Sequence, residues 1–361
     1  MSRLLMIDSG AFSVWKGGLP PLDVHEYIRF CQAVPEASYY VNLDTIPGRP
    51  NESGSYTREN VAEACRTSWR NYRAMVAELP KDKVIPVFHQ GDTVDWLDKY
   101  LNYGVSYIGI SPTSDSLSTY GKRKWMNGAG NTLRGQSGGL RKWLYDGAGR
   151  PTCKTHGFGA TAYEILTMEG WHWHSVDSSS WMHCSTWGGV YTPELRRGKW
   201  DYSLPPVPVA VSPRSPKRQN SYGNAQHLDQ LRGRRRELFL SYLDEVGVML
   251  GTHEIVQVGE GCKRTAPDTW FDRKAGLLLK VTAVGVTNSQ VERMRVNAHF
   301  LRRSSRVLSV RHLYFAGVTH ADGYTKLERT LNPRLLSYHL LKYDLKHKAL
   351  RVHRKRMREK V

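Results

Sequence analysis

The sequence predicts an α/β protein, a (β/α)8 barrel of the TIM-barrel type with a basic insertion and a basic C-terminal extension. Two observations predict this class. Short apolar runs alternate with amphipathic segments through the first 181 residues, which is typical of a parallel sheet with helical crossovers. A polar or glycine residue also follows each of six runs, where the loops of barrel enzymes carry their catalytic groups.

The six units follow one another along the first half of the chain. The expected strands cover residues 4–7, 39–43, 84–88, 107–110, 156–159 and 173–177, and the expected helices residues 21–33, 58–79, 94–103, 140–145 and 162–170. The strand-end residues are Asp8, Asp44, Gln90, Ser111, Gly157 and Asp177. A single aspartate or serine after a strand often only caps the next helix. Six such ends in register favour a shared site.

The alternation stops after Trp187. Residues 188–224 are rich in Pro, Gly, Arg and Lys and predict a long surface loop. Further helices are expected over 227–250, 288–303 and 327–343, and strands over 254–258, 277–286 and 307–318. We therefore expect residues 1–200 to form the main part of the barrel, 201–240 a basic loop with an arginine cluster, 241–345 an α/β part that completes or flanks the barrel, and 346–361 a basic tail.

The charge of the chain indicates a polyanionic partner. Its 52 Lys and Arg against 33 Asp and Glu give a net charge of +19, which favours contact with nucleic-acid phosphates over a merely soluble basic surface. The 11 Trp and 19 Tyr include aromatic faces on which bases can stack. A solvated charge run is the alternative for the expected phosphate contacts. These contacts are Arg232, Arg234, Arg235, Arg236, Lys346, Lys348, Arg351, Arg354, Lys355 and Arg356.

The cysteines indicate a reducing compartment, and the hydropathy gives no sign of a membrane span. Five scattered cysteines contain no CxxC pair, which argues against a disulfide framework and a four-cysteine zinc site. No apolar run approaches the roughly 20 residues of a membrane span. We therefore expect a cytoplasmic protein that has no membrane partner.

Four segments, in order, resemble motifs of the tRNA-guanine transglycosylases over about residues 4–182. Residues 8–12 read Asp-Ser-Gly-Ala-Phe and resemble the family's Asp-Ser-Gly-Gly-Phe motif. Residues 84–91 are similar to its strand ending in Gln-Gly, and residues 107–111 stand in the place of its Gly-Gly-Leu loop. Residues 156–177 resemble its Gly-x-Gly, helix, strand and Asp sequence. The variant motifs look most like the phage DNA-guanine transglycosylases, which exchange guanine in DNA for a 7-deazaguanine.

The resemblance implies a role for each strand-end carboxylate. Asp177 corresponds to the nucleophile that attacks the sugar C1′ carbon, and Asp8 to the general acid/base. Asp44 corresponds to the acceptor of the N1 and exocyclic amine edge of guanine. Helix capping, turns and core packing are the alternative roles for these and the other base-binding candidates. These candidates are Gln90, Gly91, Gly109, Ser111, Gly157, Gly159, Phe12, Phe158 and Trp181.

The implied partners are DNA and a free 7-deazaguanine base such as 7-cyano-7-deazaguanine. The exchange requires no cofactor, and zinc stays open as an alternative although the standard cysteine site is absent. A duplex hides the C1′ side of its bases, so the target must be flipped out or single-stranded. The chain departs from the tRNA enzymes because it lacks their Cys-x-Cys-x-x-Cys zinc motif and carries Ile110 at the second glycine of the base-binding loop. Their region of roughly a hundred residues before the first motif is also missing, so we expect the C-terminal half to supply strands. A tRNA substrate stays open as an alternative.

Two other classes of function stay open. A metal-dependent hydrolase would use the candidate ligands Cys153, His156, His172, His174, His183 and Cys184. Strand alternation argues against it, because His172 and His174 would face away from Asp177. The other class is a catalytically inactive barrel that binds nucleic acid. Activity measured after chelation separates the metal-dependent hydrolase from base exchange. The absence of a covalent complex between the protein and nucleic acid would identify the inactive barrel.

Overall fold

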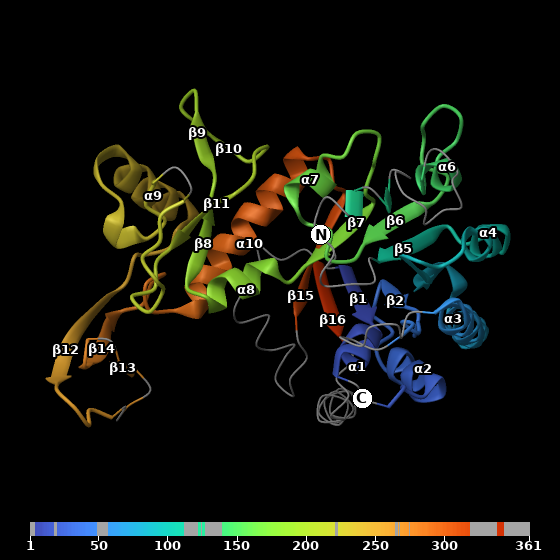
Figure 1. Cartoon of the computed structure of the whole chain (residues 1–361), viewed down its shortest axis with the longest axis horizontal. Helices are drawn as coiled ribbons and strands as arrows, with labels where there is room; N and C mark the ends of the chain where they lie inside the picture. Colours follow the sequence, from blue (N-terminus) through green and yellow to red (C-terminus); the bar gives the residue numbers. More distant parts are fainter. Residues whose placement is uncertain are drawn as a thin grey trace. The chain divides into compact units, whose positions relative to one another are not determined.

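A computed structural model describes residues 4–17, 20–48, 57–111, 122–123, 125–126, 139–220, 223–263, 266, 268–273, 275–317 and 338–342 (Figure 1). The chain divides into two compact units. The described part of the first unit comprises residues 4–179, 308–317 and 338–342, with the gaps given above, and that of the second lies within 180–307.

The first unit alternates strands with helices. Its strands are β1 Leu4–Asp8, β2 Tyr39–Val41, β3 Val84–Ile85, β4 Val87–His89, β5 Tyr107–Ser111, β6 Lys154–Gly157, β7 Ser175–Ser178, β15 His312–Gly317 and β16 Tyr338–Lys342. Its helices are α1 Ala11–Gly17, α2 Val24–Gln32, η1 Lys81–Lys83 (a 3-10 helix), α3 Arg58–Glu78, α4 Val94–Asn102, α6 Arg141–Leu144 and α7 Tyr163–Leu166. Figure 1 shows α2, α3 and α4 beside the strands β1 to β5. The predicted mixed α/β class is confirmed.

The strands form one parallel sheet in the order β3-β2-β1-β16-β15-β7-β6-β5-β4. Two strands from the C-terminal part of the chain, β15 and β16, lie between β7 and β1. Pro86 separates β3 from β4, because proline has no N–H to give to a sheet ladder. Its carbonyl still accepts the Gly109 N–H at 2.8 Å, so pairing with β5 continues past the break.

The core of the sheet joins strands that are distant in this order. Met6, Val41, Ile85, Val87, Tyr107 and Tyr314 form one buried cluster. The rings of Tyr39 and Tyr107 meet edge to face with centroids 5.0 Å apart, although β2 and β5 stand six places apart in the order. Six strand spacings in a flat sheet would span roughly 28 Å. The sheet is therefore strongly curved.

The second unit combines three small sheets with two longer helices. It contains α8 Ser180–Thr186, β8 Gly189–Thr192, β9 Glu194–Arg196, β10 Lys199–Asp201, β11 Val207–Ala210, η3 Leu228–Gln230, α9 Gly233–Val246, β12 Thr252–Val258, β13 Thr269–Asp272, β14 Leu277–Ala283 and α10 Gln290–Val307. Asn297 of α10 links these elements, since its buried side chain accepts the Tyr191 N–H at 2.6 Å and donates to the Trp181 carbonyl at 3.0 Å. One polar side chain thus ties α10 to both α8 and β8.

Two sequence predictions are wrong in the described residues. The predicted loop over 188–224 contains the strands β8 to β11, and Val190 and Val209 pair across β8 and β11 with both side chains buried. The C-terminal end of the predicted helix 327–343 is instead β16, whose backbone pairs with β1 and β15. The N-terminal segment of the first unit ends at Ser179, and the following helix α8 packs with α10 of the second unit.

Two further expectations concern disulfide bonds and membrane-spanning helices. All five cysteines are free, and Cys184 is the one that is not fully buried. Within the described ranges, no helix combines the length and the apolar character needed to cross a membrane.

Candidate active site

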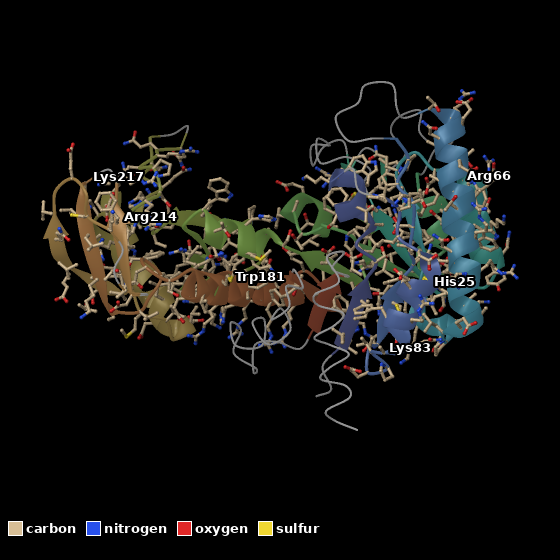
Figure 2. The ribbon with its side chains drawn as sticks, turned by 90° about the horizontal axis from the view of Figure 1, so that it is seen from below. His25, Arg66, Lys83, Trp181, Arg214 and Lys217 are labelled. Atoms are coloured by element: carbon tan, nitrogen blue, oxygen red, sulfur yellow. The ribbon has the colours of Figure 1, made fainter. Side chains whose placement is uncertain are left out.

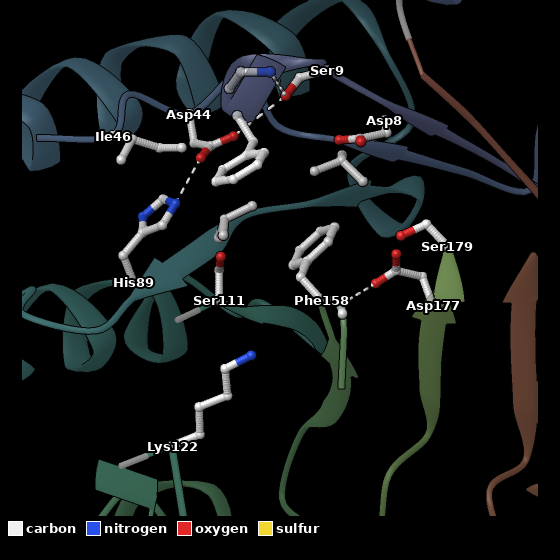
Figure 3. Close-up of a pocket in the computed structure, with 15 residues that line it drawn as sticks. Asp8, Ser9, Asp44, Ile46, His89, Ser111, Lys122, Phe158, Asp177 and Ser179 are labelled. Carbon is white, nitrogen blue, oxygen red and sulfur yellow. Dashed lines mark hydrogen bonds and ion pairs between the residues drawn. The ribbon is translucent and has the colours of Figure 1, made fainter. Parts of the chain in front are cut away.

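A cavity of about 270 Å³ opens at the carboxyl edge of the parallel sheet, close to the lower end of typical small-molecule sites (Figure 3). Strands β1, β2, β4 and β5 contribute their last residues to its lining, and β7 contributes its third residue. These residues are Asp8, Val41, His89, Ser111 and Asp177. Parallel strands end at the same edge, which is why residues from distant parts of the chain meet here.

Asp177 is held at this edge by the loop after β6. The Gly159 N–H donates to Asp177 Oδ1 at 2.5 Å, and the aspartate is 7% exposed. Gly159 has φ +58°, a left-handed conformation that costs glycine little, and its missing Cβ would meet nothing within 4 Å. The glycine therefore serves the backbone turn that aims its N–H at the carboxylate.

A chain of hydrogen bonds lies behind Asp177. The Tyr107 hydroxyl contacts the Ser175 hydroxyl, which lies 2.6 Å from Nδ1 of His156. The other ring nitrogen, Nε2, has no hydrogen-bond partner among the described residues and lies 3.7 Å from Asp177 Oδ1. Burial, with a smaller contribution from His174, lowers the pKa of His156 to about 3, so the ring is neutral at pH 7.

Asp8 enters the cavity from β1. Figure 3 shows the Asp8 and Asp177 side chains on the same side of the cavity, with Phe158 beside them. The chain turns sharply after Asp8, because Gly10 adopts φ +76° directly before α1 begins at Ala11. Ser9 follows Asp8 and donates from its hydroxyl to Asp44 Oδ1 at 3.3 Å. The Asp-Ser-Gly sequence therefore places two polar side chains in the site.

Asp44 forms a buried ion pair with His89 on the opposite side of the cavity. His89 Nε2 lies 2.8 Å from Asp44 Oδ2, and Nδ1 lies 3.6 Å from Asp92 Oδ2. Asp92 also accepts the His89 backbone N–H at 2.8 Å. Burial opposes protonation of His89, but the two carboxylates outweigh it and raise its pKa to about 10. His89 is therefore an imidazolium at neutral pH.

The other base-binding candidates divide into two groups. Phe12, Phe158, Ser111 and Gly159 line the cavity. Gln90, Gly91, Gly109 and Gly157 do not line it, and Trp181 is a buried residue of α8 in the second unit.

Packing explains two of these glycines. A Cβ on Gly109 would come within 2.5 Å of the Phe158 ring, and a Cβ on Gly157 within 2.6 Å of Ala160. Both positions therefore let the Phe158 loop lie close to its neighbours. Their effect on the site is indirect.

Several residues that line the cavity are not among the predicted site residues, above all His89. Val87 and His89 share one face of β4 and line the cavity, whereas Phe88 between them is fully buried. Strand alternation from Val87 would have selected His89 in place of Gln90. Ser9, Ser179 and Lys122 were missed as well and also line the cavity.

The metal-ligand candidates do not gather in the described part of the chain, where no three His, Cys, Asp or Glu side chains are arranged as metal ligands. The Cys153 thiol contacts the Val105 carbonyl, and His174 packs its ring against Tyr107 and His312. The His172 backbone N–H donates to the Tyr145 hydroxyl. His183 and Cys184 belong to α8 of the second unit.

The predicted phosphate contacts are only partly described. Three arginines of the cluster bond to nearby groups: Arg232 and Arg236 donate to backbone carbonyls around η3, and Arg235 donates to the Asn224 side chain. Arg234 is exposed. The tail residues Lys346, Lys348, Arg351, Arg354, Lys355 and Arg356 lie outside the described residues.

Comparisons with protein-family models, with curated proteins and with solved structures found no match to this chain. The geometry of the cavity and the motifs of the sequence are therefore the basis for a proposed function.

Proposed function

We propose that this protein exchanges a purine base in a nucleic acid by a double displacement at the C1′ carbon of the nucleotide sugar. The observation that carries the proposal is the cavity shared by Asp8 and Asp177. Their strands, β1 and β7, are separated in the sheet by two others, and the residues lie 169 positions apart in sequence. Two carboxylates at one opening provide the nucleophile and the acid/base that such an exchange needs.

In the first step, an Asp177 carboxylate oxygen attacks C1′, the bond from C1′ to N9 of guanine breaks, and Asp8 protonates the leaving base. In the second step, Asp8 takes the proton from N9 of the incoming 7-deazaguanine. That nitrogen attacks C1′, and the bond from C1′ to the Asp177 oxygen breaks. Asp8, which begins the cycle protonated, has regained its proton, and Asp177 is again a free carboxylate group. The Gly159 N–H, 2.5 Å from Asp177 Oδ1, orients the nucleophile throughout.

The remaining lining residues suit a flat base with a donor edge. Phe12 and Phe158 offer apolar ring faces. Asp44 offers carboxylate oxygens to the N1 and amine hydrogens of guanine, and His89 at 2.8 Å together with Ser9 at 3.3 Å fixes its orientation. A preoriented acceptor is effective because it needs no rearrangement when the base binds.

We propose further that the curved sheet is a closed (β/α)8 barrel. β3 and β4 are consecutive in the chain, are interrupted only by Pro86, and stand at the two ends of the strand order. Counting them as one strand turns the nine-strand order into a ring of eight. The contact between Tyr39 and Tyr107 supports this closure, because these rings would be far apart across an open sheet.

The proposed substrate is DNA. The net charge of +19 supports a polyanion, and the cavity is small enough to require a base that is flipped out or single-stranded. The incoming partner is a free 7-deazaguanine base, such as 7-cyano-7-deazaguanine, and the exchange needs no cofactor.

The test is mass analysis of nucleosides after incubation of the protein with a labelled 7-deazaguanine and either single-stranded DNA or tRNA. We expect the labelled base in DNA with the wild-type protein and none with Asp177→Asn. The matched control is Asp82→Asn, an exposed aspartate of η1 that does not line the cavity. Label found only in tRNA would show that tRNA, and not DNA, is the substrate. Equal label with Asp177→Asn would refute the proposed chemistry.

A further inference from the structure

A second cavity, of about 540 Å³, lies entirely within the second unit. Trp187, Arg214, Asp268, Trp270 and Arg293 are among the residues that line it. Figure 2 labels Arg214 on this unit. The charged side chains of this lining are two guanidinium groups and one carboxylate, so the lining is positive, whereas three aspartates line the first cavity.

Arg293 is a buried cation without a carboxylate partner among the described residues. It is 8% exposed, and its Nε and one Nη donate to the carbonyls of Ser185 and Val286 at 2.8 and 2.7 Å. Burial, with a smaller contribution from the nearby charge of Arg214, lowers its pKa to about 10. A buried, uncompensated guanidinium is costly unless an anion approaches it.

Arg214 brings a second positive charge to the same cavity. Its guanidinium lies 4.6 Å from the centre of the Trp270 ring, which orients it by a cation–π contact. Neither arginine forms an ion pair with Asp268 in the described part of the chain, although Asp268 also lines the cavity. Two oriented guanidinium groups provide the fork of donors that binds a phosphate.

Trp187 supplies an aromatic face beside these charges. Its side chain is 80% exposed, yet its backbone is fixed, since its N–H donates to His183 at 3.1 Å and its carbonyl accepts the Ser215 hydroxyl at 2.8 Å. The following Gly188 has φ +81° and no room for a Cβ, which would come within 2.3 Å of Ser215. An exposed ring on a fixed backbone can stack on a base with little loss of entropy.

We propose that this cavity binds one nucleotide of a single-stranded nucleic acid, with its phosphate between Arg214 and Arg293 and its base against Trp187. The second unit favours a polyanion, because residues 180–307 contain 20 Lys and Arg but 11 Asp and Glu. The proposal rests on the proposed function only for the identity of the strand as DNA. The ligand would be bound through backbone charge and stacking, without readout of its sequence.

The test measures binding of fluorescent oligodeoxythymidine to the full chain by anisotropy across a range of salt concentrations. Such a strand contains no guanine, so its binding does not depend on base exchange. We expect Trp187→Ala and Arg214→Ala each to weaken binding about tenfold, and Arg214→Ala also to reduce the salt slope by about 0.7. Trp187→Phe should restore most of the affinity. The control Arg196→Ala removes an exposed arginine of β9 that does not line the cavity and should leave the affinity unchanged.

Competition identifies the source of the phosphate. Thymidine monophosphate and inorganic phosphate should displace the strand only at much higher concentration, because each offers part of the recognised unit. A monophosphate that binds as tightly as the strand would overturn the assignment in favour of a free nucleotide. Unchanged affinity in Trp187→Ala and Arg214→Ala would overturn the site altogether. If the wild-type protein shows no base exchange but these binding results are obtained, the proposed function is wrong and the nucleotide site is still supported.

Discussion

Two aspartate–histidine pairs border the first cavity, and they hold opposite charge states. Asp44 and His89 lie 2.8 Å apart, and the pKa of His89 is raised to about 10. Asp177 and His156 lie 3.7 Å apart, and the pKa of His156 is lowered to about 3. Both histidines are buried, so burial alone does not separate them.

The neighbours of each histidine explain the difference. His89 has a second carboxylate, Asp92, at its other nitrogen, whereas His156 has the neutral hydroxyl of Ser175. Two carboxylates offset the desolvation of an imidazolium, and one carboxylate beyond hydrogen-bond distance does not. The Asp44 pair is thus a fixed ion pair suited to hold an acceptor in place. Asp177 instead faces a neutral ring, which is compatible with the nucleophilic role that we propose for it.

The largest effect is expected from removing the charge of Asp177. Asp177→Asn should lower the rate of base exchange at least about 1,000-fold, because an amide cannot form the covalent bond to C1′. DNA affinity should stay within twofold. Mass spectrometry of protein trapped with substrate measures the adduct directly. A wild-type adduct on another residue, with none on Asp177, would reassign the nucleophile.

The next effect concerns stability. His89→Gln should lower the free energy of unfolding by roughly 3–5 kcal/mol near pH 6, because it leaves buried carboxylates without their cation. The folded pKa of about 10 lies above the ordinary value of 6.5, so this stabilisation is complete below pH 6.5 and is lost as the pH rises toward 10. Urea denaturation of both proteins at several pH values checks this. A difference between the proteins that stays constant up to pH 10 would show that His89 is not an ion-pair partner.

Asp44 gives a smaller effect on the reaction than Asp177. Asp44→Asn should lower kcat/KM about 100-fold, mainly through the KM for the incoming base, because the new NH₂ group repels the donor edge of the purine. Steady-state kinetics with varied base concentration separate KM from kcat. A loss confined to kcat would instead place Asp44 in the chemical step and remove the contrast between the two pairs.

The smallest effect is expected from His156. His156→Gln should lower kcat about tenfold, since the ring only positions Asp177, and Ser175→Ala should act in the same direction. The folded pKa of about 3 lies below 6.5, so wild-type protein loses stability as the pH falls from 6.5 toward 3. The stability difference from His156→Gln should therefore shrink on acidification, opposite to the trend for His89. A parallel trend for both histidines would contradict the assigned charge states.

The sequence predicted the strand ends well where the alternation of apolar and polar residues was regular. Asp8, Asp44, Ser111 and Asp177 were identified from their positions after apolar runs, and all four line the cavity. The prediction failed at Gln90, because counting from the end of the run ignores which face of the strand a side chain occupies. It failed over 188–224, where prolines and glycines interrupt four short strands that pair with one another within this stretch.

The sequence by itself determined the alternation of strands and helices, the positive charge, and the carboxylates at the strand ends, because these depend on local patterns. Tertiary structure alone decided that β15 and β16 lie between β7 and β1. It also decided which histidine is charged, because a pKa depends on groups that folding brings together from distant positions. Strand order and side-chain charge are properties of contacts between remote residues, and a linear pattern does not record them.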